Sequence, residues 1–319
     1  MTRVSLSEDL TDTQWLVELE EIGEEAGYFA PLGDHHAAVF DDRGQKLLFV
    51  SFESVVGIRS TADNGLPLGF SVTEDTNWSH LNLIAFRDTW FRSRHVYGFF
   101  DRLVDDGFFE DFDHVVFYGA GMGGYAAAAF SVAAPGATVI AVSPQATLDR
   151  AQTEWDDRFP QMRRADFKSR YGFAPDMIEA AEAAYLVYDP SEVEDAMHAS
   201  LFHGTNVTRV RYRRGRSGAI DADLKDLGIL PKLVKRVGKG KLTPKSIHKA
   251  LRARHDHKPY LRALLGRVLA EDRPWLTAVL CRAVLRDKNI GRFRHYLEEA
   301  EAQLLAEGRR VPGERREDA

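Results

Sequence analysis

Residues 114–145 have the sequence HVVFYGAGMGGYAAAAFSVAAPGATVIAVSPQ, and this stretch decides the fold. A β-branched and aromatic run at 115–118 is followed by a glycine-rich turn, an alanine-rich segment and a second β-branched run at 138–142. This order predicts a strand, a turn, a helix and a second strand. Two strands joined through a helix pair in parallel by a right-handed crossover. The sequence therefore predicts an α/β fold with a mostly parallel sheet flanked by helices.

The turn from Gly119 to Gly124 matches two different patterns. As G-x-G-x-x-G after a strand, it fits a dinucleotide-binding loop, in which a pyrophosphate approaches the backbone at a helix N-terminus. As the elbow of an α/β-hydrolase, G-x-S-x-G, it has Gly121 where the nucleophilic serine should stand. The first interpretation predicts an NADP-dependent oxidoreductase. The second predicts a hydrolase elbow that lacks its reactive side chain.

The composition is that of an ordinary globular protein with 319 residues, 44% of them hydrophobic and 28% charged. No run of eighteen apolar residues occurs, and the first dozen residues lack the apolar core of a signal peptide, so we expect a cytoplasmic protein that does not bind a membrane. Cys281 is the only cysteine and lies among apolar residues, which predicts a buried packing role. We expect neither a metal site nor a cofactor, and His35 and His36 are interpreted as loop residues.

Charge is distributed unevenly along the chain. Residues 209–258 hold 16 Lys and Arg against 4 Asp, a net charge of +12, whereas the whole chain carries -6. A basic block of this kind is typical of a surface that contacts an acidic macromolecule. The sequence favours a solvated helical surface that complements the acidic remainder of the chain, with an acidic macromolecular partner for residues 209–258 as the alternative.

The periodicity along the chain predicts four parts. The predicted parts are an N-terminal helix within 1–30, an α/β-hydrolase-like domain at 31–230 with an insertion at about 147–182, a basic helical extension at 231–308, and a disordered tail at 309–319. Within the domain, the apolar runs 37–40 and 46–52 flank Asp41-Asp42-Arg43-Gly44-Gln45, which predicts an antiparallel hairpin.

The position of the glycine-rich turn favours the hydrolase interpretation over the dinucleotide loop. A dinucleotide loop normally opens its domain after the first strand, but at least three predicted strands precede Gly119. The acidic residue expected after the next strand is missing, because that strand ends in Ser143-Pro144-Gln145. The order of an elbow at Gly121, an acid at Asp189 after a later strand and a final strand is the order of the hydrolase triad.

Over residues 45–230 the sequence resembles bacterial α/β-hydrolase-fold proteins with a G-x-S-M-G-G-[FY]-x-A elbow. The stretches that carry the resemblance are GAGMGGYAAAAF, SPQATLD, VYDPSEVEDAMHA and NVTRVRYRRGRSGAIDADL. The resemblance implies a serine nucleophile at position 121, a general base after a Gly at position 219, and an acid at Asp189 or Asp195. This chain has Gly121 and Ala219 instead, so both the nucleophile and the base are absent and a pseudoenzyme is implied.

An anion-binding nest remains possible at the elbow without a serine. We expect the amides of Met122 and Gly123, at a helix N-terminus, to face the segment Glu53-Ser54 and to bind an unknown small-molecule or anionic ligand. This arrangement predicts a ligand- or partner-binding role for a catalytically degenerate protein.

An active esterase or acyl hydrolase with a displaced serine is the leading alternative. Ser143 and Ser54 both follow predicted strands and are the candidate nucleophiles, and His80 and His198 are the candidate bases. A serine needs such a base within hydrogen-bond reach, so the alternative depends on where the fold places these side chains.

Overall fold

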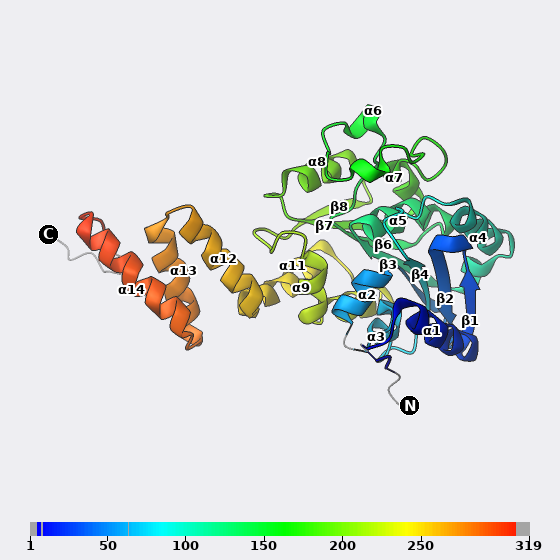
Figure 1. The fold of residues 1–319 in the computed structure, drawn as a ribbon, viewed down its shortest axis with the longest axis horizontal. Helices are drawn as coiled ribbons and strands as arrows, with labels where there is room; N and C mark the ends of the chain where they lie inside the picture. The colour runs from blue at the N-terminus through cyan, green and yellow to red at the C-terminus, as the bar shows by residue number, and fades with distance from the viewer. Residues whose placement is uncertain (1–4, 8, 63, 311–319) are drawn as a thin grey trace. The chain divides into compact units, whose positions relative to one another are not determined.

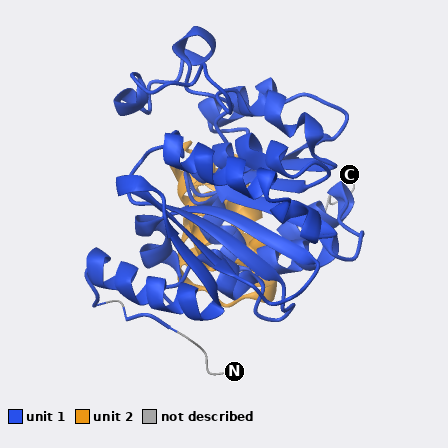
Figure 2. Cartoon of the chain, turned by 90° about the vertical axis from the view of Figure 1, so that its right-hand side faces the viewer, with its two compact units in different colours: residues 1–252 blue, residues 253–319 orange. Residues whose placement is uncertain are grey.

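The computed structural model describes residues 5–7, 9–62 and 64–310. The chain divides into two compact units, residues 1–252 and residues 253–319 (Figure 2). Nearly all of the predicted disordered tail, 309–319, lies outside the described residues. None of the described helices is both long enough and apolar enough to cross a membrane.

The first unit is built on an eight-stranded sheet that is mostly parallel. In spatial order the strands are β1 (Gly27–Pro31), β2 (His36–Asp41), β4 (Ser79–Ala85), β3 (Leu47–Ser54), β5 (His114–Ala120), β6 (Thr138–Val142), β7 (Ala183–Tyr188) and β8 (Val207–Arg211). Only the β1–β2 and β2–β4 pairs are antiparallel. Helices cover both faces (Figure 1), so the predicted α/β-hydrolase-like fold is confirmed.

The hairpin predicted from the run Asp41 to Gly44 was wrong. β2 and β3 do not pair, because β4 lies between them and bonds to both. The turn between β2 and β3 is instead held to β4, since the Arg43 amide donates to the hydroxyl of Ser79. β4 is buried along its whole length, so the centre of the sheet is its most stable place. The residues of a turn carry no information about whether a later strand, here β4, will lie between the two strands that the turn connects.

The sheet has two different covered faces. On one face α4 (Arg94–Asp105) and α5 (Met122–Phe130) pack on an apolar core that includes stacked rings of Phe52, Phe100 and Phe130. On the other face lie α1 (Asp12–Ala26), α2 (Val55–Thr61) and α3 (Leu68–Val72). This second face mixes apolar residues with buried polar side chains, which are described below.

The neighbouring strands β3 and β5 send the chain to opposite faces. After β3 the chain enters α2 and α3 on the second face and then turns to β4, whereas after β5 it enters α5 on the first face and continues to β6. This divergence is a topological switch point, where open α/β sheets form a crevice beyond the carboxyl ends of their strands. Ser54 and Gly121 stand at the edges of that crevice.

Between β6 and β7 the chain forms only short helices, α6 (Arg150–Thr153) and α7 (Ala174–Met177), with single 3₁₀ turns. After β7 come α8 (Val193–Leu201), β8, α9 (Ile220–Asp226), α10 (Ile229–Val237) and α11 (Pro244–Leu251). We expected the extension to begin at residue 231, but the units divide after Arg252. The apolar sides of α10 and α11 are buried within the first unit, for example at Leu233 and Ile247, and their basic composition concealed this.

The second unit contains α12 (Lys258–Ala270), α13 (Pro274–Asp287) and α14 (Gly291–Ala306). Ala278 of α13 packs against Ala300 and Leu304 of α14, and Arg282 donates to Glu301 at 2.6 Å. Cys281 is buried, as predicted, and burial raises the pKa of its thiol to about 11. A thiol with so high a pKa is a packing group rather than a nucleophile.

The turn between β5 and α5 depends on glycine for two separate reasons. A Cβ on Gly119 would lie 2.1 Å from the carbonyl oxygen of Gly123, and one on Gly123 would lie 2.2 Å from that of Phe52. These two glycines therefore allow α5 to approach β5 and β3. Gly121 has φ 54° and ψ -117°, and a Cβ there would meet nothing within 4 Å. At Gly121 the constraint is backbone conformation, and the space beyond it is open.

Two alanine substitutions in this turn should therefore differ. Gly121→Ala should lower the free energy of unfolding by about 1–2 kcal/mol, because only the unfavourable backbone conformation opposes it. Gly123→Ala should cost about 3 kcal/mol or more, because the methyl group meets a backbone oxygen that cannot move alone. Denaturant unfolding followed by circular dichroism measures both, and equal losses would contradict this account of the turn.

Candidate functional site

The turn at Gly121 presents backbone amides and no side chain. The amide of Gly121 donates to the carbonyl of Val142 at 2.8 Å, and the amide of Tyr125 donates to the carbonyl of Gly121 at 2.9 Å. The amides of Met122 and Gly123 donate to no group among the residues that the structure describes. A strand, a sharp turn and a helix thus follow one another here, and the residue at the turn, Gly121, carries no side chain.

Asp189 follows β7, and its carboxylate is hydrogen-bonded to neighbouring parts of the chain. One carboxylate oxygen accepts from the amide and the hydroxyl of Ser191, at 2.9 and 2.7 Å. The other accepts from the amide of Gly215 at 2.6 Å. Asp189 is 2% exposed. The acid that would orient a catalytic histidine therefore holds the backbone of the loop in which that histidine would stand.

The loop at 212–219 is fastened by ionic and polar bonds. Tyr212 donates its hydroxyl to Asp223 at 2.9 Å, and Arg216 donates from two nitrogens to the same carboxylate at 2.9 and 2.5 Å. Asp223 lies on α9, directly after the loop. Ala219, the expected base position, is half-buried at the start of α9, and its methyl group cannot accept a proton.

Asp195 and His198 lie on α8 and anchor the segment 147–182 rather than facing Gly121. Asp195 is paired with Arg158 at 2.7 Å. His198 is fully buried; its Nδ1 accepts from the Ala146 amide at 3.1 Å, so its Nε2 donates to Asp156 at 2.8 Å. Burial would raise the pKa of Asp156, but hydrogen bonds from His198 and Arg158 hold that pKa well below its usual value.

His80 and the two candidate serines are also separated. His80 stands at the amino end of β4, the opposite edge of the sheet from Gly121. Ser54 caps α2 by accepting from the Gly57 amide at 3.0 Å. Ser143 directly follows β6 with φ 43°. Among the described residues, no histidine is hydrogen-bonded to the hydroxyl of either serine.

Glu53 turns away from the elbow, onto the second face of the sheet. Its carboxylate accepts from the Ser51 hydroxyl and from the Leu68 amide, both at 2.9 Å. Burial raises the pKa of Glu53, and Lys225 opposes that rise. The side chain thus serves the first turn of α3. The β3 backbone that meets the turn is that of Phe52, whose carbonyl oxygen would lie 2.2 Å from a Cβ on Gly123.

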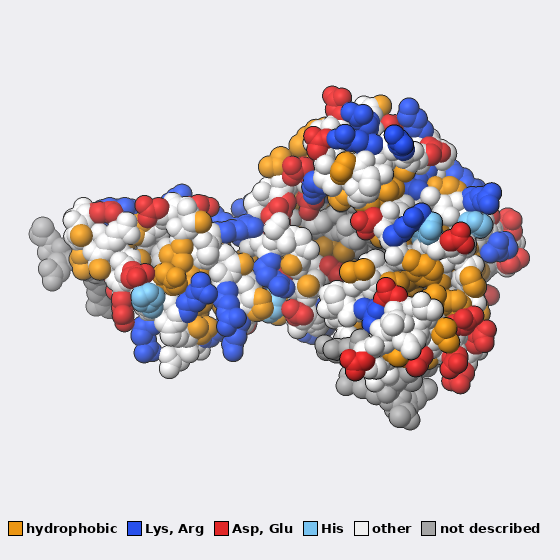
Figure 3. Space-filling view, in the orientation of Figure 1, with side chains coloured by type: hydrophobic (Ala, Val, Ile, Leu, Met, Phe, Trp, Pro, Cys, Tyr) orange, Lys and Arg blue, Asp and Glu red, His pale blue; other side chains and the backbone are white. Residues whose placement is uncertain are grey.

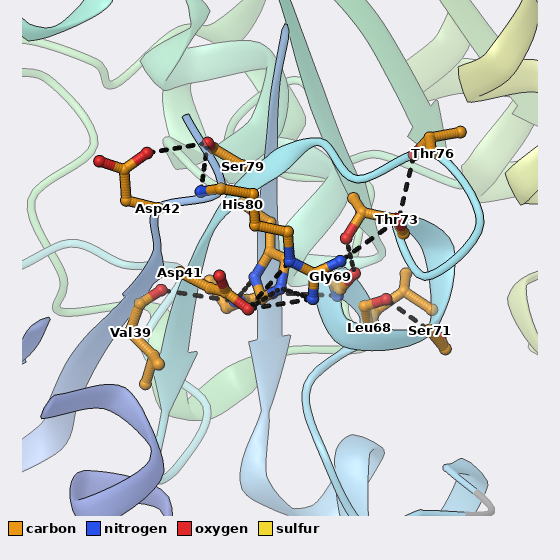
Figure 4. Close-up of polar contacts among 12 residues, drawn as sticks. Val39, Asp41, Asp42, Leu68, Gly69, Ser71, Thr73, Thr76, Ser79 and His80 are labelled. Carbon is orange, nitrogen blue, oxygen red and sulfur yellow. Dashed lines mark hydrogen bonds and ion pairs between the residues drawn. The ribbon is translucent and has the colours of Figure 1, made fainter. Parts of the chain in front are cut away.

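A buried polar network docks α3 on the sheet (Figure 4). At the start of the helix, the Gly69 amide donates to Asn82 at 3.0 Å, beside the bond from Leu68 to Glu53. At its end, Arg43 donates to the carbonyl of Thr73 at 3.4 Å. A Cβ on Gly69 would lie 2.4 Å from Oδ1 of Asn82, so glycine is required there.

His80 completes this network from β4. Asn82 donates to its Nδ1 at 2.8 Å, and its Nε2 lies 3.3 Å from the carboxylate of Asp41, which also pairs with Arg43 at 3.0 Å (Figure 4). Burial lowers the pKa of His80, although Asp41 opposes this. The ring packs edge-on against Phe70. His80 is therefore a structural residue of the second face.

A groove of about 1150 Å³ runs over α3 on this face. Its walls combine apolar residues, such as Phe70 and Leu230, with charged ones. The charged lining residues are Glu25, Asp41, Asp42, Arg43, Glu53, Glu74, Lys225 and Asp226. Carboxylates outnumber cations among them, and Figure 3 shows acidic side chains gathered over α1, which contributes Glu25. Sequence reasoning missed this groove, because its walls come from segments far apart in the chain.

The position of His36 also differs from the one expected from the sequence. It begins β2 rather than lying in a loop, and its Nε2 is 2.7 Å from the hydroxyl of Thr89. The Thr89 amide in turn contacts the sulfur of Met122 at 3.2 Å, so His36 lies two contacts from the elbow. Burial, with His35 and Arg87 nearby, lowers the pKa of His36 to about 4. The side chain is therefore neutral near pH 7.

Comparisons with known proteins give only remote similarities. No protein-family model and no curated protein matches the sequence. A glycosylation-associated protein complex from Streptococcus agalactiae has a TM-score of 0.46 at 17% identity, covering 63% of this chain and 44% of that one. A thermostable carboxylesterase from a metagenomic library has a TM-score of 0.41 at 13% identity, covering 75% and 100%.

An esterase from the archaeon Pyrobaculum calidifontis is similar at the same level, with a TM-score of 0.42 at 13% identity, covering 74% of this chain and 95% of that one. The chain spans less than half the length of the Streptococcus agalactiae chain. Similarities this distant do not identify an activity. The function of this chain therefore has to be argued from its own side chains.

The buried neutral His36 predicts a loss of stability in mild acid. The pKa of His36 is lower in the folded than in the unfolded chain, so the unfolded chain binds a proton first as the pH falls. The contribution of neutral His36 to the free energy of unfolding is therefore present above pH 6.5 and is lost as the pH falls from 6.5 towards 4. The loss should reach about 3 kcal/mol in the free energy of unfolding. His36→Gln should remove most of this pH dependence.

Denaturant titrations at a series of pH values between 7.5 and 4.5 measure the effect. His203→Gln, which changes an exposed histidine, is the matched control and should retain the slope of the unmodified protein. An unchanged slope in His36→Gln would show that another group is responsible.

Proposed function

We propose that this protein is a catalytically degenerate α/β-hydrolase-like protein, which binds a ligand or a partner and does not hydrolyse esters. One observation carries the proposal: the elbow is intact around Gly121, but no side chain stands there to attack a carbonyl. Acyl transfer through a covalent intermediate needs a nucleophilic atom and a base that removes its proton. Gly121 and Ala219 supply neither.

The surroundings support the loss of both groups. Asp189 gives its carboxylate to the amides of Gly215 and Ser191, and Asp223 binds Arg216 in the loop that would carry the base. These bonds stabilise the loop without a histidine. A displaced serine is not favoured, because Ser54 is engaged as a helix cap and His198 is engaged with Asp156.

The oxidoreductase alternative gains no support from the turn. Gly119 and Gly123 are required where α5 meets β5 and β3, so their presence is explained by helix packing alone. The loop also follows the fifth strand of the chain, in an interior position of the sheet, rather than opening the domain.

The single buried Cys281 suits the reducing cytoplasm, which is the location we propose.

We place the ligand in the groove over α3. Its volume of about 1150 Å³ is ample for a small molecule, and apolar walls with a few polar groups are typical of ligand sites. Arg43 is neutralised by Asp41, and Lys225 is paired with Asp221 at 3.0 Å, so both cations of the lining already have a counterion. Because carboxylates outnumber cations in the lining, the groove favours a ligand with an apolar body and a positively charged group.

The protein should be inert towards reagents that require an activated serine. A fluorophosphonate probe should leave no adduct, and p-nitrophenyl acetate should be hydrolysed no faster than by buffer, because no nucleophile stands at position 121. Intact-mass spectrometry and absorbance at 405 nm measure the two outcomes, with an active serine esterase as the positive control. An adduct that disappears in Ser143→Ala or Ser54→Ala would instead establish a displaced active site.

The groove should bind an apolar amine. Dansylcadaverine, a fluorescent amine, should bind with an increase in emission, and the double variant Glu25→Lys/Glu74→Lys should weaken it about tenfold, because both side chains are exposed lining residues. Glu110→Lys/Glu182→Lys makes the same charge change at exposed positions outside the groove lining and should bind the dye as before. Equal affinity in both variants would exclude the groove as the site.

A further inference from the structure

The helices α10 and α11, together with the turn between them, carry charge of one sign only. Residues 227–252 contain eight Lys and Arg and no Asp or Glu. Both helices are amphipathic: α10 buries residues such as Leu233 and Val234, and α11 buries Ile247 and Leu251. The basic side chains therefore gather on the outward sides of these helices.

Most of these side chains have no counterion. Lys235 is paired with Asp75 at 2.8 Å. The other seven are exposed and form no ion pair among the residues that the structure describes: Lys232, Arg236, Lys239, Lys241, Lys245, Lys249 and Arg252. We call these seven residues the basic face. All of them belong to the first compact unit.

The basic face is electrostatically unfavourable for the protein alone. Lys232 and Arg236 are four residues apart on α10, and Lys245 and Lys249 are four apart on α11. Like charges at this spacing destabilise a helix by about 0.2–0.5 kcal/mol per pair. Like charges at this spacing that no nearby acidic group offsets are expected where the residues serve a function. A polyanion would remove the repulsion.

We propose that the basic face binds the phosphate backbone of double-stranded nucleic acid. Lysine and arginine contacts to phosphates supply sequence-independent affinity. A helix of nine residues, the length of α10, spans about 13 Å, and a duplex presents one charge per about 1.7 Å of its axis. Each helix can therefore face several phosphates at once. This inference does not depend on the proposed loss of catalysis.

The composition of the surface favours a duplex over other anionic partners. A membrane-binding surface inserts apolar side chains, but the large exposed hydrophobic residues of the described chain, such as Val56 and Met197, lie on other elements. Protein interfaces are built on buried aromatic and apolar anchors and are depleted in lysine. Single strands are held by aromatic stacking, and residues 227–252 contain no Phe, Tyr or Trp.

The test measures binding of the full chain to a fluorescein-labelled 20-base-pair DNA duplex by fluorescence anisotropy. About four phosphate contacts predict a slope near -3.6 in a plot of log affinity against log salt, and so a loss of roughly 100-fold between 50 and 200 mM salt. The variant Lys232→Glu/Arg236→Glu/Lys245→Glu/Lys249→Glu should lose binding at least 100-fold at 50 mM salt. Circular dichroism confirms that this variant is folded.

A matched control changes four exposed basic residues elsewhere in the first unit: Arg94→Glu/Arg150→Glu/Arg164→Glu/Lys168→Glu. It alters the net charge equally and should bind the duplex within about threefold of the unmodified protein. The proposal is overturned if the duplex does not bind at 50 mM salt, or if the control loses as much affinity as the test variant. Tighter binding to a single-stranded 20-mer or to phosphatidylserine vesicles would also overturn it, in favour of the other partner class.

Discussion

The close approach of α5 to β3 and β5 is the constraint on which the first unit depends. The helix begins where backbone meets backbone, and a single methyl group on Gly119 or Gly123 would come within about 2 Å of a carbonyl oxygen. β3 and β5 pair in the centre of the sheet, and the chain leaves them on opposite faces. The glycine turn before α5 stands at the edge of the crevice that this divergence forms.

Around that elbow, polar groups that suit a triad are used to hold the chain together. Asp189 binds the backbone of the loop that follows β8, and Asp223 fastens the same loop through Arg216. His198 and Asp195 are bound into a network with Asp156 and Arg158. The acidic side chains and the His198 ring in these networks are buried and hydrogen-bonded, so the removal of one would leave an unpaired partner.

Two surfaces away from the elbow have the properties of binding sites. The groove over α3 is partly apolar with an excess of carboxylates, whereas the basic face of α10 and α11 is polar and entirely positive. The two surfaces therefore carry charge of opposite sign, and our two proposals assign them ligands of opposite charge. The charge asymmetry of the sequence thus corresponds to separate surfaces of the folded unit.

The sequence by itself determined the parallel sheet, the position of the elbow and the absence of a side chain at Gly121, because these follow from local periodicity and residue identity. Tertiary structure decided the strand order, in which β4 separates β2 from β3, and the direction of Glu53. It also linked His36 to Met122 through Thr89 and placed His80 at the far edge of the sheet. Strand pairing and side-chain contacts of this kind join residues far apart in the chain, and local patterns carry no information about such partners.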